Sequence, residues 1–237
     1  MGKLCAAGAD INATAPDEHG CTALQAAARG GYLEVVDRLL ARGAAVNAAT
    51  SEYGSTALQT AATFGHRDMV DRLLAEGADV NAEAGRFGYT ALQAAARERY
   101  LEIVDRLLAQ GADVNADASK TGSTALRAAA RWGRLEVVDR LLAEGADVNA
   151  EACKTGSTAL RAAARWGHLE VVDRLLTAGA DIDTANALKA AAEKGLLQIV
   201  DKLLTAFADI DTKEALNAAA EQGHTQVVAR HQAHRKH

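Results

Sequence analysis

Aromatic residues are scarce in this chain, at 4% of its 237 residues, although hydrophobic residues as a whole make up 49%. A core of that composition has to be built from Ala, Leu and Val, as solenoids of stacked helix pairs allow. Globular enzymes of this length usually carry more aromatic side chains. The composition therefore favours a stacked helical scaffold.

Several other features are missing, and each excludes a class of protein. The three cysteines are an odd number, which argues against a disulfide framework and favours an intracellular location, cytoplasmic or nuclear. No apolar run approaches about 18 residues and no signal-peptide pattern is present, so we expect no membrane partner. The net charge of −5 disfavours nucleic acid as a partner.

A single phrase, TAL(Q/R)AA, with Thr60 in place of the first Ala in the second copy, recurs at a constant step of 34 residues and begins at Thr22, Thr56, Thr90, Thr124 and Thr158. A fixed period of this length predicts a stack of similar supersecondary units rather than one irregular globule. No pair of helices this short buries its apolar face alone. Stacking supplies the missing partner, and stability becomes a sum of neighbour interfaces.

One repeat shows how the helices are specified. Thr22 suits a helix N-cap, and Gln25 three residues later completes a capping box. A short Ala-rich helix follows and ends at a glycine pair. A second, amphipathic helix begins at about Leu33, and Gly43 is suited to its end. The polar stretch that follows predicts an extended loop or hairpin that projects from the stack.

The repeat TALxAAARxGxLEVVDRLLAxGADVNA resembles the ankyrin repeat, whose family pattern has TPLH where this chain has TALQ or TALR. The resemblance covers nearly the whole chain. It implies an all-α solenoid of stacked helix-turn-helix pairs with projecting hairpin loops. The loss of the family's imidazole implies that these hairpins are held differently. The predicted organisation is a remnant of a truncated repeat over 1–13, ankyrin repeats 1 to 5 over 14–47, 48–81, 82–115, 116–149 and 150–183, a short repeat 6 over 184–211, and a C-terminal capping repeat 7 with a basic tail over 212–237.

The last two repeats are shorter, with a step of 28 residues, because only residues 183–185 or 211–213 link one helix pair to the next. We therefore expect both to lack the projecting hairpin. Phe207 stands where every earlier repeat has glycine. The helix before it either ends without a left-handed residue or uses Phe207 to pack over the edge of the stack, and we favour packing.

The ends of the chain bear on its origin. Leu4 and Cys5 align with Leu39 and Leu40, so the chain starts in the middle of a predicted second helix. We expect it to be the C-terminal recognition region of a longer multidomain protein. Over 23 residues, 118–140 of repeat 4 and 152–174 of repeat 5, the two repeats differ at only two positions. Since that similarity suits design as well as recent duplication, the alternative is an engineered or consensus-derived array with no native partner.

The sequence offers little for catalysis or for metal binding. Carboxylates such as Glu34 and Asp37 recur on the solvated side of the second helix with Arg partners, which indicates a charged outer face rather than an acid–base pair. His231, His234 and His237 step by three, but no carboxylate or cysteine completes a metal site. We expect no enzyme activity, no cofactor and no metal.

A stripe at one position of the repeat is the strongest functional signal. In the family that the repeat resembles, the two residues before the glycine that ends the first helix face a concave groove and commonly engage partners. Both tryptophans of this chain occupy the second of these positions, and Trp and Arg are frequent binding anchors. The predicted partner-binding stripe comprises Phe64, Arg97, Arg127, Arg131, Trp132, Arg161, Arg165 and Trp166.

Two members of this stripe contradict local preference. Arg127 and Arg161 replace the capping-box Gln in the first helical turn, where a cation opposes the helix dipole. A residue placed against its local preference is a candidate for function. A basic groove on an acidic body predicts that the partner is a protein or an acidic or aromatic peptide segment, with Lys120 and Lys154 extending the patch. We expect the array itself to be a monomer.

Two alternatives to this assignment remain. Repeats 4 and 5 are nearly identical, so their shared residues can be one event copied once, with each Arg only stacking on its neighbour's Trp. The chain can also be chiefly a substrate, because its loop asparagines match those that hydroxylases modify in some members of the family. The asparagines concerned are Asn47, Asn81, Asn115 and Asn149.

Overall fold

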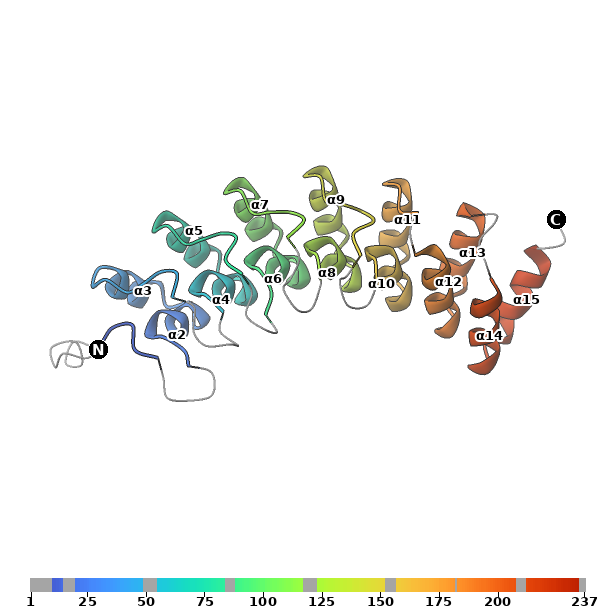
Figure 1. Cartoon of the computed structure of the whole chain (residues 1–237), viewed down its shortest axis with the longest axis horizontal. Helices are drawn as coiled ribbons and strands as arrows, with labels where there is room; N and C mark the ends of the chain where they lie inside the picture. Colours follow the sequence, from blue (N-terminus) through green and yellow to red (C-terminus); the bar gives the residue numbers. More distant parts are fainter. Residues whose placement is uncertain are drawn as a thin grey trace. The chain divides into compact units, whose positions relative to one another are not determined.

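A computed structural model describes residues 10–14, 20–48, 55–83, 88–116, 123–151, 157–181, 183–207 and 212–234, with the side chains of 231–234 excepted. Fourteen helices fill these ranges, with no β-strand among them and one isolated bridge between Thr14 and Thr22 (Figure 1). Two compact units divide the chain: unit 1 is residues 1–121 and unit 2 is residues 122–237. The predicted remnant over 1–13 lies mostly outside the described residues.

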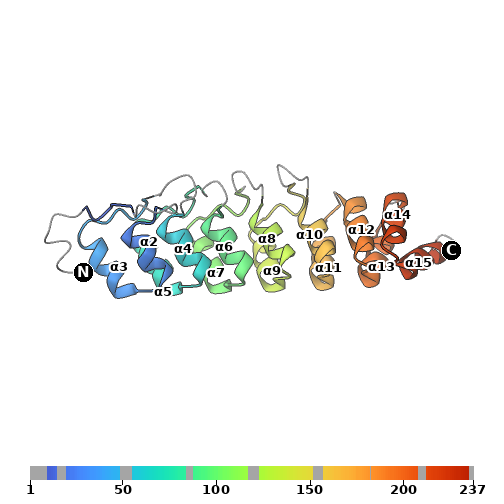
Figure 2. The same cartoon turned by 90° about the horizontal axis from the view of Figure 1, so that it is seen from below.

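In unit 1, three helix pairs follow one another along the chain. The first helices pack side by side in one row and the second helices form another row, as two perpendicular views show (Figures 1 and 2). We call these rows the first helices and the second helices throughout. The pairs are α2 Ala23–Arg29 with α3 Leu33–Leu40, α4 Ala57–Phe64 with α5 Arg67–Ala75, and α6 Ala91–Glu98 with α7 Leu101–Ala109.

Unit 2 is built in the same way from four helix pairs. Its first helices pack in the order α8, α10, α12 and α14, each against the next. The pairs are α8 Ala125–Arg131 with α9 Leu135–Ala143, α10 Ala159–Trp166 with α11 Leu169–Thr177, α12 Thr184–Glu193 with α13 Leu197–Ala206, and α14 Lys213–Glu221 with α15 Thr225–His234.

The core is made of small side chains on the first helices and branched ones on the second. Ala95 and Ala129 are 0% exposed, as are Val104 and Leu141. Because alanine has so little side chain, neighbouring first helices approach closely, and Leu and Val from the second helices fill the space behind them. The scarcity of aromatic residues is therefore a consequence of the close stacking.

The predicted capping boxes are present at the starts of α2, α4 and α6. Thr56 accepts from the backbone N–H of Gln59, and the Gln59 side chain accepts in return from the backbone N–H of Thr56. The same amide has a second role, since its Nε2 donates to the carbonyl oxygen of Ala82 at 2.8 Å. Gln25 and Gln93 reach the corresponding loops, at Ala48 and Ala116. A buried glutamine therefore holds the base of the loop in place of the family's imidazole.

Removing one of these amides is expected to be costly. Gln59 is 2% exposed, so Gln59→Ala leaves a backbone N–H and a carbonyl buried without their partner and lowers the free energy of unfolding by about 1–3 kcal/mol. The exposed Gln110, at the end of α7, provides the control, because Gln110→Ala is expected to change stability by about 0.5 kcal/mol or less. Urea unfolding followed by circular dichroism measures both. Equal losses would show that the amide bonds add nothing to stability.

The loop asparagines connect successive repeats. Asn47 accepts from the backbone N–H of Asp79 at 2.8 Å, and its Nδ2 donates to the carbonyl oxygen of Gly77 at 3.1 Å. Asn81 bonds the next loop in the same way, through Asp113 and Gly111. These side chains serve the stacking of the array.

The linkers of the short repeats differ from the prediction. Thr184 and Ala185 belong to the first turn of α12, and Lys213 is the first residue of α14, so none of these residues is linker. Asp183 precedes α12 with a φ of 63°, which turns the chain directly into the helix. At Phe207 the chain is extended, with φ −132° and ψ 91°, and the side chain is partly buried. Phe207 is therefore not left-handed, unlike the glycines at the same position of the earlier repeats.

Candidate functional site

Two tryptophan side chains stand out on the first helices of unit 2. Trp132 follows the last residue of α8 and is 44% exposed, whereas Trp166 is the last residue of α10 and is 55% exposed. The three alanines before each Arg-Trp pair are buried, so the helix register turns the pair outwards at the helix end. Exposed aromatic side chains that gather on one surface mark interaction sites, whereas single exposed ones are common.

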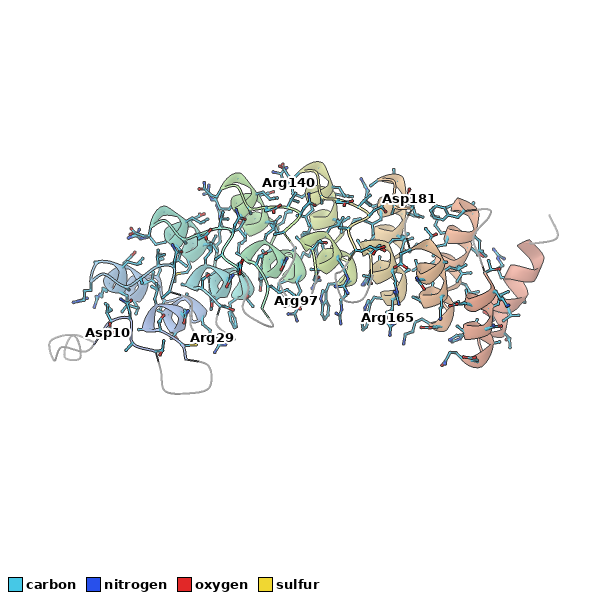
Figure 3. All side chains as sticks on the ribbon, in the orientation of Figure 1. Asp10, Arg29, Arg97, Arg140, Arg165 and Asp181 are labelled. Atoms are coloured by element: carbon cyan, nitrogen blue, oxygen red, sulfur yellow. The ribbon has the colours of Figure 1, made fainter. Side chains whose placement is uncertain are left out.

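An arginine lies between these two rings. The guanidinium carbon of Arg131 is 5.9 Å from the ring centre of Trp132 and 5.5 Å from that of Trp166, both within cation–π range. Arg165 is exposed, and within the described residues it makes no hydrogen bond or ion pair. Figure 3 shows Arg165 on the first-helix side of unit 2, away from Arg140 beside the second helices. Arg131, Trp132, Arg165 and Trp166 form what we call the Arg/Trp cluster.

A histidine from the next repeat holds the end of α8 in place. The Nε2 of His168 lies 3.0 Å from the carbonyl oxygen of Arg131, and since a carbonyl only accepts, this nitrogen donates. The ring packs over Gly133, where a Cβ would lie 2.5 Å from Nδ1 of His168. The glycine thus makes room for the ring that positions the backbone of the cluster.

Sequence reasoning missed this contact, although a signal for it exists. The residue before the second helix is a histidine in three repeats, and each one follows a Gly with positive φ. All three rings form a hydrogen bond with a carbonyl oxygen at the end of the first helix of the preceding repeat. The pairs are His66 with Arg29, His168 with Arg131, and His224 with Glu193.

The two arginines in the first helical turn lie apart from the exposed cluster. The side chain of Arg161 is 31% exposed and its Nη1 is 3.9 Å from the carboxylate of Asp183, which is 4% exposed. Arg127 is likewise partly buried. Arg161 therefore compensates a nearly buried carboxylate of the next linker, a role that explains a cation in a turn that disfavours one.

In unit 1, the predicted stripe residues are paired with neighbours. Phe64 is 46% exposed, and the guanidinium carbon of Arg29 lies 5.5 Å from its ring centre. Arg97 lies over the ring of Tyr89 at 5.5 Å and is 3.2 Å from the carboxylate of Glu98. Figure 3 places Arg29 and Arg97 on the first-helix side of this unit. The predicted extensions of the patch at Lys120 and Lys154 lie outside the described residues.

A polar hollow of about 550 Å³ opens beside the Arg/Trp cluster, between α10, α12 and α14. The hydrogen bond that Lys189 donates to Glu214, at 2.9 Å, raises the pKa of the lysine, and the charge of Glu214 adds to this effect. Such a charged wall suits a peptide or a polar group better than an apolar small molecule. Its charged residues are Arg165, Lys189, Glu193, Lys194, Glu214 and Glu221.

Carboxylates of the second helices form ion pairs with the following repeat. Arg106 reaches back 35 residues to Asp71, and this hydrogen bond is the main reason why its pKa is raised. Glu34 pairs with Arg38 within one helix, as its spacing predicts. Further ion pairs between neighbouring second helices include Arg67 with Glu102, Arg72 with Asp37, Arg174 with Asp139, Lys202 with Asp173 and Arg230 with Asp201. Exposed pairs of this kind contribute little to stability one by one, so these acids make a charged outer face rather than a main source of stability.

No group of three His, Cys, Asp or Glu side chains within the described residues could hold a metal ion. The predicted tail histidines fall outside that search, because the side chains of His231 and His234 are not described and His237 lies beyond the described residues. Cys21 is a free thiol, whereas Cys5 and Cys153 lie outside the described residues. Among the described helices, none is long and apolar enough to cross a bilayer.

Comparison with known families agrees with the geometry. A family model described as "Ankyrin repeats (3 copies)" matches four overlapping stretches, residues 2–84, 49–118, 82–152 and 116–186. A comparison with curated proteins gave no match. The family matches span well over half of the sequence and coincide with helix pairs whose first helices begin at a capped threonine. The chain belongs to the ankyrin-repeat family.

Proposed function

We propose that this protein is a scaffold without enzyme activity that binds a segment of a partner protein on the Arg/Trp cluster of unit 2. Ankyrin repeats are in general protein–protein interaction modules. The observation that carries the proposal is the pair of tryptophans, 44% and 55% exposed, on neighbouring first helices. Exposed Trp beside Arg is the composition of an interface hot spot.

The free energy available from covering the tryptophans is substantial. A Trp side chain buries about 200 Å² when it is fully enclosed, so covering the exposed half gains about 2.5 kcal/mol per ring at about 25 cal/mol per Å². A partner that covers both rings therefore gains enough for a specific contact. Without a partner, the same apolar surface stays in water.

Stacking with Arg131 does not account for these rings. If the cluster were only an inert stack, the arginine and the neighbouring repeat would be expected to cover most of the indole surface. Trp166 nevertheless remains 55% exposed with Arg131 beside it. Stacking instead holds the rings in one orientation, which reduces the entropy that they lose when a partner binds.

The charge of the surface indicates the kind of partner. Arg131 and Arg165 are exposed at the ends of α8 and α10, and neither helix contains an acidic residue, although the whole chain has a net charge of −5. A local basic surface with two indole rings attracts an acidic segment with an aromatic or apolar side chain. We therefore propose an acidic or aromatic peptide segment of a protein as the partner.

The test is capture of partners from a native lysate by the full chain and by two variants. Trp132→Ala with Trp166→Ala is expected to weaken binding by about 2 kcal/mol or more, which is a loss of more than tenfold in affinity. Glu136→Ala with Glu170→Ala is the control, because both residues are exposed on the second helices of the same unit. Circular dichroism first establishes that all three proteins fold equally. A protein that the tryptophan variant recovers as well as the parent does would exclude the cluster as its binding site.

A further inference from the structure

We infer that unit 2 binds a segment whose two ends carry opposite charge, and that it orients this segment with the acidic end over α8 and α10 and the basic end over α14. This inference rests on the proposed function, since it describes the partner of the same surface. It goes further by assigning the order of charges along the segment and the direction in which the segment lies.

The basis is a reversal of charge along one row of helices. One position at the end of each first helix is basic in α8 and α10 and acidic in α12 and α14. It is the last residue of the helix in α8, α12 and α14, and the last but one in α10. Further charged residues lie elsewhere on these two helices. Helix α14 has Lys213 and Glu214 at its start, and α12 has Lys189, with Lys194 just beyond its end. The four residues at the equivalent position are Arg131, Arg165, Glu193 and Glu221.

Several of these charges are not neutralised by the fold. Arg165, Lys194 and Glu221 are exposed, and within the described part of the chain they form no hydrogen bond or ion pair. Lys189 is already bonded to Glu214, so this pair contributes little net charge. The surface is therefore positive at Arg131 and Arg165, mixed at α12, and negative at Glu221.

The hollow places the reversal on one continuous surface. Its lining includes Arg165 from α10, Glu193 and Lys194 from the end of α12, and Glu221 from α14, and α12 packs between the other two helices. Packed helices are about 8–10 Å apart, so the path across the four first helices is about 25–30 Å long. An extended segment covers that distance with about eight or nine residues. The segment that fits has acidic side chains near one end, basic side chains near the other, and an apolar side chain near the acidic end.

The same charges disfavour other segments. A uniformly acidic segment brings its far end against Glu193 and Glu221, where like charges repel. An alternating segment places one unfavourable charge at each end of the surface. Because specificity is a difference of affinities, this repulsion selects charge order and not net charge alone.

Two peptides of ten residues and identical composition test the order of charges. One has its acidic residues at one end and its basic residues at the other, and the second alternates them. Each peptide carries one apolar residue. Each is also made with its sequence reversed, so that both chain directions are tested. Fluorescence anisotropy with the full chain is expected to show at least about tenfold tighter binding of the block peptide in one of the two directions. Equal affinities, or no binding of either peptide, would overturn the inference.

The tryptophans report the orientation. Trp132 and Trp166 are the chain's two tryptophans, and both lie at the basic end of the surface. A nitroxide on the acidic end of the block peptide is expected to quench their emission more strongly than a nitroxide on the basic end. Equal quenching from both ends would contradict a fixed orientation.

A charge exchange provides the matched control. Arg131→Glu and Arg165→Glu combined with Glu193→Lys and Glu221→Lys leave the net charge unchanged, and are expected to reverse which labelled end quenches. Glu193→Lys with Glu221→Lys alone is expected to abolish the preference for the block peptide. If the order of charges has no effect but Trp132→Ala with Trp166→Ala still abolishes partner capture, the inference fails and the proposed function stands. If partner capture also survives that substitution, both fail.

Discussion

Replacing Gly133 by alanine is expected to lower the free energy of unfolding by about 2–4 kcal/mol. Its φ is 66°, in the left-handed region where a Cβ costs about 1–2 kcal/mol. The new methyl would also lie 2.5 Å from Nδ1 of His168, well inside van der Waals contact. The ring has to move to relieve this overlap, which disturbs its hydrogen bond to the carbonyl oxygen of Arg131 and costs about 1 kcal/mol or more.

Gly145 separates the two causes. Its φ is 83°, but among the described residues, its own chain neighbours aside, no atom lies within 4 Å of the place where a Cβ would be. Gly145→Ala is therefore expected to cost only the backbone term of about 1–2 kcal/mol. Urea unfolding followed by tryptophan emission compares the variants, because both tryptophans lie in unit 2. Equal losses for Gly133→Ala and Gly145→Ala would contradict the proposed clash with the ring.

A double substitution tests the contact directly. With His168→Ala already present, the ring is gone, and adding Gly133→Ala is expected to cost no more than Gly145→Ala costs. The coupling between Gly133 and His168 is then about 1–2 kcal/mol, in the range found for residues in contact. Strictly additive losses would mean that the two residues act independently.

The sequence predicted well whatever depends on a single repeat. The Thr22 and Gln25 capping box, the glycine that ends the second helix and the pair of Glu34 with Arg38 all follow from residues within a few positions of one another. Hydrogen-bond partners at such spacing are set by the geometry of the helix itself. Five near-identical copies of the pattern then made the stacked fold predictable as well.

Contacts between repeats were harder to predict. The bond from His168 to Arg131 spans 37 residues, and that from Arg106 to Asp71 spans 35. Which of several arginines meets which aspartate depends on how one helix pair is displaced against the next, and no residue pattern within a repeat specifies that displacement. The outer face was predicted to be charged, but the arrangement of its pairs was not.

The prediction of the short linkers was wrong for a different reason. Asp183 was predicted to begin a three-residue connection, but the chain enters α12 immediately after it. Asn, Thr and Asp are typical of loops, and they obscured the start of a helix that has no capping box. At Arg161 the same linker explains an unfavourable cation, through the carboxylate of Asp183 at 3.9 Å. The contact with the next repeat thus explains why Arg161 stands in a helical turn where a cation is unfavourable.

Replacing Leu141 by alanine is expected to lower the free energy of unfolding by about 2–5 kcal/mol, the largest effect among the variants considered. Leu141 lies in α9 and is 0% exposed, so its loss leaves a cavity between the two helix rows of unit 2. Leu142, the next residue, is only partly buried and provides the control. Its replacement by alanine is expected to cost about 1 kcal/mol, and urea unfolding by tryptophan emission compares the two.

Leu141→Ala also separates stability from recognition. Stability in a repeat array is a sum of interfaces between neighbours, and the side chain of Leu141 belongs to that sum without reaching the exposed Arg/Trp cluster. At a temperature where the variant is still fully folded, its affinity for a captured partner is expected to match that of the parent within about twofold, whereas Trp132→Ala with Trp166→Ala loses affinity with little change in unfolding. Loss of binding by folded Leu141→Ala protein would mean that the partner recognises the packing of the whole unit, and the cluster alone would no longer account for binding.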